Sequence, residues 1–214
     1  MGRYRCVFWG LFLCVFHLSL YGVEFLFTGL ALAIFTFGLY GLYNQTENRH
    51  IHLAANLSLA NTLIRLAGYF ILLIAYNFYD DAPSFPQYIL FSVMNLFLML
   101  TLWNLFAGMR EVFEPHRDQP NAAGWIAACG RGMIAAPILF TIPVILYGVL
   151  MNLTFPGFGD AERAMLAVTC CNALPILYSL TLIARYKRYL KMEAEEDEEE
   201  DADKSLPTSE KPAM

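Results

Sequence analysis

The sequence lacks the short motifs that mark common membrane-embedded enzymes. It contains no His-Glu-x-x-His and no Gly-x-Ser-x-Gly, and no long apolar segment carries paired carboxylates. The period-two alternation of polar and apolar residues that transmembrane β-strands require is missing as well. We therefore expect a chain that is not an enzyme, that holds no metal or other cofactor, and that crosses no membrane as a β-barrel.

The chain is instead rich in apolar sequence. Hydrophobic residues make up 57% of it and its mean hydropathy is +0.46. Several runs reach the roughly 20 residues that a helix needs to cross about 30 Å of hydrocarbon. The sequence predicts an all-α fold, a polytopic transmembrane bundle of six helices within one domain of residues 1–191. The predicted spans are residues 6–21, 25–43, 53–77, 87–108, 125–151 and 162–184.

The first two predicted spans form one apolar block that is broken only by Tyr21-Gly22-Val23-Glu24. A single helix over this block would be roughly 57 Å long, which exceeds the thickness of any bilayer. Two helices joined by a tight turn fit better. A cleaved signal peptide is the alternative, because a basic N-terminus precedes the apolar run, and cleavage would leave five spans.

Lys and Arg residues outside the spans fall on alternate connections. Because cytoplasmic loops are enriched in these residues, the pattern predicts an integral membrane protein of the endomembrane system or plasma membrane with both termini cytoplasmic. The connections after the first, third and fifth spans are then outside. This topology leaves only Arg163 outside and places on the inner side Arg3, Arg5, Arg49, Arg110, Arg117, Arg185, Lys187, Arg188 and Lys191.

Residues 192–214 form an acidic C-terminal tail. The stretch from Glu193 to Asp203 is made almost entirely of acids. Charge repulsion and the lack of large apolar side chains predict that the tail is disordered. The basic cluster from Arg185 to Lys191 is expected to attract anionic lipids. The tail is interpreted either as a solvating segment or as a docking segment for a basic partner.

Polar residues inside the spans are the candidate functional residues, since a charge there costs on the order of 2.5–3.5 kcal/mol. Arg65 lies about 18 Å by helical rise from both ends of its span, too deep to reach either interface. Asn61, Asn95 and Asn172 come to a similar depth, which predicts a midplane polar layer. A group nearer the cytoplasm holds Asn56, Asn104 and Arg131, and a group near the outer face holds His17, Glu24 and Asn77.

These layers have two interpretations. In the structural one, asparagine side chains bond across helices and hold the bundle together. In the functional one, they line a hydrated route or a head-group pocket. The fifth span fits close helix packing because it carries the small residues Gly124, Ala127, Ala128, Gly130, Gly132, Ala135 and Ala136.

The connections are short, and we expect no folded extramembrane domain. The longest inner one, Met109 to Gly124, is predicted to be a polar, solvated loop. Asn152 begins an Asn-Leu-Thr acceptor sequon on the outer side, a possible glycosylation site. His50 and His52 are interpreted as solvated or interfacial residues, because no third ligand lies near them in the sequence.

The expected function is non-enzymatic: a multi-pass membrane protein that assembles with or escorts another membrane protein. Its expected partners are the lipid bilayer and a membrane protein or a second copy of the chain, and no nucleic acid. The alternative is a small-solute or ion transporter or channel that uses the midplane layer around Arg65. A lipid-modifying membrane enzyme is the third hypothesis.

Overall fold

The computed structural model describes residues 2–15, 24–78, 84–152 and 176–185, and these residues are almost entirely helical. No strand occurs among them, which confirms the all-α prediction. The elements are α1 (Gly2–Val15), α2 (Glu24–Thr46), α3 (Arg49–Phe78), α4 (Ser84–Phe113), the short 3₁₀ helix η1 (Glu114–His116), α5 (Pro120–Asn152) and a last helix over Ile176–Arg185.

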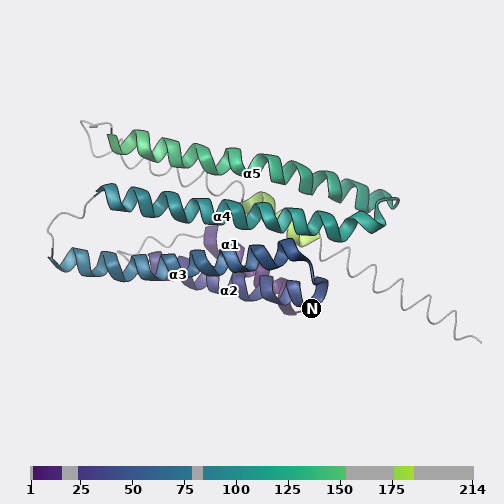
Figure 1. The fold of residues 1–214 in the computed structure, drawn as a ribbon, viewed down its shortest axis with the longest axis horizontal. Coiled ribbons are helices and arrows are strands. Elements are labelled where there is room, and N and C mark those ends of the chain that lie inside the picture. The colour runs from purple at the N-terminus through teal and green to yellow at the C-terminus, as the bar shows by residue number, and fades with distance from the viewer. Residues whose placement is uncertain (1, 16–23, 79–83, 153–175, 186–214) are drawn as a thin grey trace, which may run out of the picture.

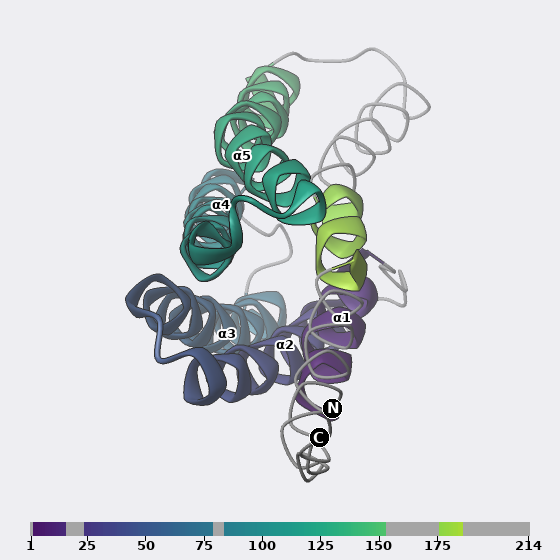
Figure 2. The ribbon, with the colours of Figure 1, turned by 90° about the vertical axis from the view of Figure 1, so that its right-hand side faces the viewer.

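The helices lie side by side as an elongated bundle (Figure 1). Seen along the bundle, α5, α4, α3, α2 and α1 follow one another in space as they do in sequence (Figure 2). The helix Ile176–Arg185 lies between α5 and α1 and closes the circuit. Its Tyr178 hydroxyl donates a hydrogen bond of 2.9 Å to the Ala128 carbonyl of α5.

Two of the described helical stretches are long and apolar enough to cross a membrane. They are Ser92–His116 and Ala122–Ile142, and two shorter apolar helices cover Arg5–Cys14 and Ile176–Arg185. Length and composition of these helices support association of the chain with a membrane.

The helices extend beyond the predicted spans. The loop predicted over Met109–Gly124 is much shorter than expected, because α4 continues to Phe113, η1 follows, and α5 already starts at Pro120. Its charged residues Glu111, Glu114 and Arg117 are exposed, as predicted. Met109 and Phe113 are fully buried. Their packing stabilises the last turn of α4 as helix, although charged residues lie between them in the sequence. Proline at the first helical position costs no hydrogen bond and favours a helix start there.

The tightest helix contact joins α1 and α2. Gly10 lies against the backbone of Phe35, and a Cβ at Gly38 would come within 2.5 Å of the Val7 backbone nitrogen. Side chains at these two glycines would therefore push the helices apart. Glycines at a crossing allow two helix backbones to approach closely, as they do in membrane helix pairs.

One end of the bundle collects the basic residues at the helix termini, and we call it the basic end. Antiparallel neighbours bring together there the end of α2 and the start of α3, the end of α4 and the start of α5, and both outermost helix termini. For example, Arg185 lies over the Trp125 ring, 5.7 Å from its centroid. The basic end carries the described residues Arg5, Arg49, Arg110, Arg117 and Arg185.

Candidate functional site

A polar stripe runs along the inner side of α3. Ser58, Asn61, Thr62 and Arg65 are spaced three or four residues apart and so lie on one face of the helix. The first three are buried and Arg65 is half-buried. The midplane residues predicted on this span therefore belong to a longer polar face that is directed into the bundle.

Hydroxyl groups join this face to α2. Thr36 donates through Oγ1 to the Leu32 carbonyl at 2.7 Å, and its Oγ1 lies 2.7 Å from Ser58 Oγ. Because the Thr36 proton is directed at the carbonyl, Ser58 is the donor to Thr36. Thr62 donates to the Ser58 carbonyl at 2.9 Å. These bonds join α2 to α3 through hydroxyl groups, not through the asparagines of the structural interpretation.

Asn61 differs from these hydroxyl groups. Its side chain is 0% exposed. Both Oδ1 and Nδ2 are buried, and neither has a hydrogen-bond partner within the described part of the chain. An amide in this situation bears the full cost of lost hydration, about 1–3 kcal/mol per unsatisfied group. Such a cost calls for a physical explanation.

Arg65 and Asn95 lie at the level of Asn61. Gly108 packs against Ile51, and this antiparallel register of α3 and α4 places Asn95 of α4 level with Arg65. Asn95 is buried. On the α1 side, the charge of Arg65 acts on the buried Cys14 thiol. Three of the four predicted midplane residues thus share one level, while the fourth, Asn172, lies outside the described residues.

The second predicted group shares a level but not a face. Asn104 is buried, whereas Asn56 is exposed and accepts a 2.6 Å hydrogen bond from the Tyr40 hydroxyl. Arg131 is exposed on α5. The three side chains therefore do not line one cavity.

The outer group is only partly covered by the described residues. His17 lies outside them. Glu24 opens α2 and Asn77 lies in the last turn of α3, but their side chains are not among those described. Asn152, the predicted glycosylation site, is the last residue of α5, and its side chain is not among those that the structure describes.

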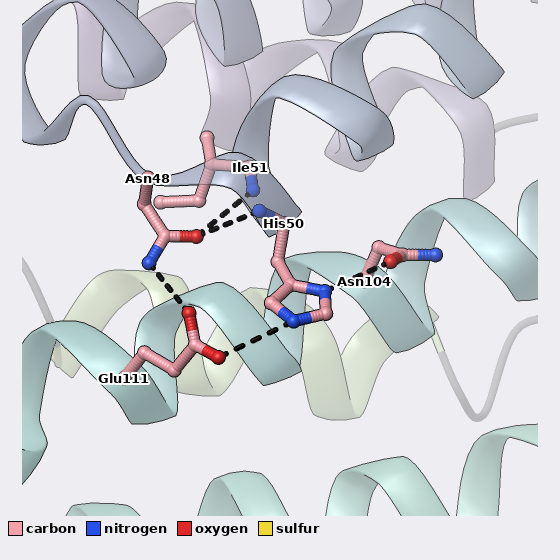
Figure 3. Close-up of polar contacts among 5 residues, drawn as sticks. All are labelled: Asn48, His50, Ile51, Asn104 and Glu111. Atoms are coloured by element: carbon pink, nitrogen blue, oxygen red, sulfur yellow. Dashed lines mark hydrogen bonds and ion pairs between the residues drawn. The ribbon is translucent and has the colours of Figure 1, made fainter.

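Four side chains at the basic end form a polar network that the sequence does not predict (Figure 3). Asn48 precedes α3, and its Oδ1 accepts from the backbone N–H of His50 at 2.9 Å and of Ile51 at 3.2 Å. Its Nδ2 donates to Glu111 Oε2 of α4 at 2.9 Å. An asparagine just before a helix is a recognisable N-cap residue in a sequence. Its hydrogen bond to Glu111 could not be predicted, because Glu111 is on another helix far along the chain.

His50 lies between two acceptors in this network, which we call the capping network (Asn48, His50, Asn104 and Glu111). Asn104 donates through Nδ2 to the Leu100 carbonyl at 2.8 Å, so its Oδ1 faces His50 Nδ1 at 3.2 Å as an acceptor. His50 Nε2 lies 3.2 Å from Glu111 Oε1. His50 is therefore a bonded, half-buried residue and is not simply solvated.

The small residues of α5 divide between two faces. Ala128, Gly132 and Ala136 are buried, and Gly132 lies against the rings of Phe106 and Tyr178. Gly124 and Gly130 have open space where a side chain would be. A stripe at helical spacing, which we call the α5 outer face, comprises Gly124, Ala127, Gly130, Arg131, Ile134, Ile138 and Ile145. All of these residues are exposed except Gly130, which is half-buried.

Metal binding finds no support among the described residues, where no group of three His, Cys, Asp or Glu side chains is placed to hold an ion. Comparisons with protein-family models, with curated proteins and with solved structures found no match to this chain.

Proposed function

We propose that this chain is a multi-pass membrane protein with six spans that assembles with, or escorts, another membrane protein. The observation that supports this proposal best is the α5 outer face. Its isoleucines are highly exposed, with Ile134 at 70%, Ile138 at 56% and Ile145 at 57%. An apolar stripe of this length requires either lipid or a protein partner beside it.

The shape of the stripe favours a helix as its occupant. Gly124 and Gly130 leave gaps beside the large side chains of Ile134 and Ile138. In membranes, helices associate where small residues let the backbones approach and neighbouring side chains interlock. A transmembrane helix of a partner, or α5 of a second copy, would fill these gaps better than mobile lipid tails.

Arg131 adds a charge to the same face. The residue is exposed, and it lies toward the basic end because the neighbouring Gly132 packs against Phe106 of α4. Side chains of a helix lean toward its N-terminus, and α5 starts at the basic end, so the guanidinium is expected on that side. An acidic group of a partner or a lipid phosphate would bind it there.

The distribution of charge supports the proposed orientation. The described basic residues at helix ends gather at one end of the bundle, as the positive-inside rule requires of a cytoplasmic side. With that end in the cytoplasm, the acidic tail that follows the last helix is presented there too.

Site-specific photo-crosslinking tests the proposal. The photoreactive residue p-benzoylphenylalanine would replace Ile134 on the α5 outer face and, as the matched control, Phe37, which is 67% exposed on α2. In native membranes we expect a discrete protein adduct from position 134 and none from position 37. A mass of twice the chain would identify a second copy as the partner.

Gly130→Leu should abolish the adduct at position 134, because a Cβ at Gly130 meets nothing within 4 Å and the larger side chain would fill the gap that the partner uses. The purified variant should remain folded and free of aggregates. Lipid adducts alone, or the same protein adducts from both positions, would contradict the proposal.

A second candidate function is a pathway for a small solute or ion through the midplane. It is favoured by the burial of Asn61 and by the charge of Arg65 one turn away. Solute flux in vesicles reconstituted with the purified protein alone separates this candidate from the first.

A further inference from the structure

The buried polar side chains of the bundle follow a rule that Asn61 breaks. Thr36, Ser58, Thr62 and Asn104 all have hydrogen bonds to a neighbouring carbonyl or side chain. Asn61 is 0% exposed, and neither of its polar atoms bonds to any described group. Buried polar groups in folded proteins nearly always have a partner, either in the protein or in ordered water.

The chemistry of the amide limits what such a partner is. Nδ2 offers two N–H donors, and Oδ1 offers two acceptor lone pairs. An anion satisfies only the donors and a metal cation only the oxygen. A neutral molecule that both donates and accepts satisfies both, and it must be small because the side chain has no exposed surface.

The surroundings of Asn61 are polar enough to hold such a molecule. Arg65 lies one turn further along the same face, with its Nε buried. Asn95 lies level with it on α4, and the Cys14 thiol of α1 is within reach of the Arg65 charge. A buried water makes about three hydrogen bonds to groups of this kind, whereas cavities that stay dry are lined by apolar side chains.

We propose that Asn61 is a binding site for ordered water in the middle of the bundle, on the inward face of α3 and level with Asn95 of α4. Water accepts from Nδ2 and donates to Oδ1, and the neighbouring polar groups hold it in place. This site is closed: it hydrates the interior without opening a path for solutes. The inference does not depend on a partner at the α5 outer face.

Hydroxyl radicals produced from bound water by X-ray pulses test the site, because they oxidise the nearest reactive side chains. The probe is water itself, and the full-length protein in detergent is the sample. Cys14 is 4% exposed on α1 and is the described cysteine that the charge of Arg65 reaches, and Cys129 is 0% exposed on α5 and serves as the internal control. We expect Cys14 to be oxidised at least fivefold faster than Cys129.

Asn61→Leu provides the matched variant. It should reduce the oxidation rate of Cys14 to that of Cys129, and it should not raise the melting temperature. A higher melting temperature for Asn61→Leu would show that the Asn61 amide is not hydrated in the native protein. In that case leucine stabilises the fold because it removes a polar group that has no hydrogen bonds. Equal rates for Cys14 and Cys129 in the unmodified chain would overturn the proposal even if the variant fails to fold.

A bulky, charged thiol reagent distinguishes a closed site from an open route. Cys14 in native membranes should resist a charged methanethiosulfonate. Rapid modification of Cys14 would show that solutes of that size reach the midplane. It would contradict a closed water site and support an open pathway.

Discussion

At the scale of single residues, the short link between α2 and α3 contains a strained position. Glu47 has a φ of 50°, the only positive φ at a non-glycine residue among those described. Its backbone N–H donates to the Tyr43 carbonyl at 2.7 Å, which satisfies a carbonyl at the end of α2. Asn48 then caps the start of α3. Glu47 and Asn48 thus end one helix and begin the next, and this requires a left-handed backbone conformation at Glu47.

Glu47→Gly should therefore stabilise the protein. Left-handed backbone costs an L-residue about 1–2 kcal/mol, and glycine adopts it without a Cβ clash. The melting temperature of the detergent-purified variant should rise by a few degrees. Glu47→Ala removes the same charge but keeps the Cβ, so it should give no such gain. A lower melting temperature for the glycine variant would show that the Glu47 side chain contributes more than its strain costs.

At the scale of the elements, close helix approach depends on which glycines face a neighbour. The α1–α2 crossing needs Gly38, because a Cβ there would overlap the backbone of Val7. On α5, a Cβ at Gly124 would meet nothing within 4 Å. The same residue type therefore has opposite roles in the two helices.

Alanine substitutions should show this contrast. Gly38→Ala is expected to destabilise the bundle by about 1–3 kcal/mol, since two helix backbones must separate. Gly124→Ala should stabilise it by about 0.5–1 kcal/mol, because alanine loses less conformational freedom in a helix. Thermal unfolding of both variants in the same detergent measures the difference. Equal shifts of one sign would contradict the α1–α2 packing.

At the scale of the whole molecule, alternating helix directions bring the described terminal basic residues to one end. Arg5 and Arg185 lie there at opposite ends of the described chain, together with Arg110 at the end of α4. A bundle with its basic residues at one end is expected to insert in a membrane in one orientation, with that end in the cytoplasm.

Labelling of single cysteines should reveal this orientation. In a background without other cysteines, Ser84→Cys lies at the start of α4, opposite the basic end, and Ser205→Cys lies in the tail. An impermeant maleimide added to intact cells should modify position 84, and position 205 should react only after permeabilisation. Modification of both positions from the same side would contradict the proposed topology.

Composition and spacing were enough to predict the helical class, the alternation of basic connections and the common depth of Asn61, Arg65 and Asn95. These features follow from composition and from the rise of a helix, which are local properties. The sequence also showed that the fifth span is rich in small residues. It did not show which of them face a neighbour, because that depends on how α5 is rotated against α4.

Which polar groups find hydrogen-bond partners depends on how the helices pack against one another. The capping network joins Asn48 and His50 to Glu111 of another helix, and neither composition nor spacing indicates such a contact. The structure also separated Asn56 from Asn104 and left the buried Asn61 amide without a described partner. Hydrogen bonds between helices depend on rotation and register, which are set by packing of the whole bundle and not by any single segment.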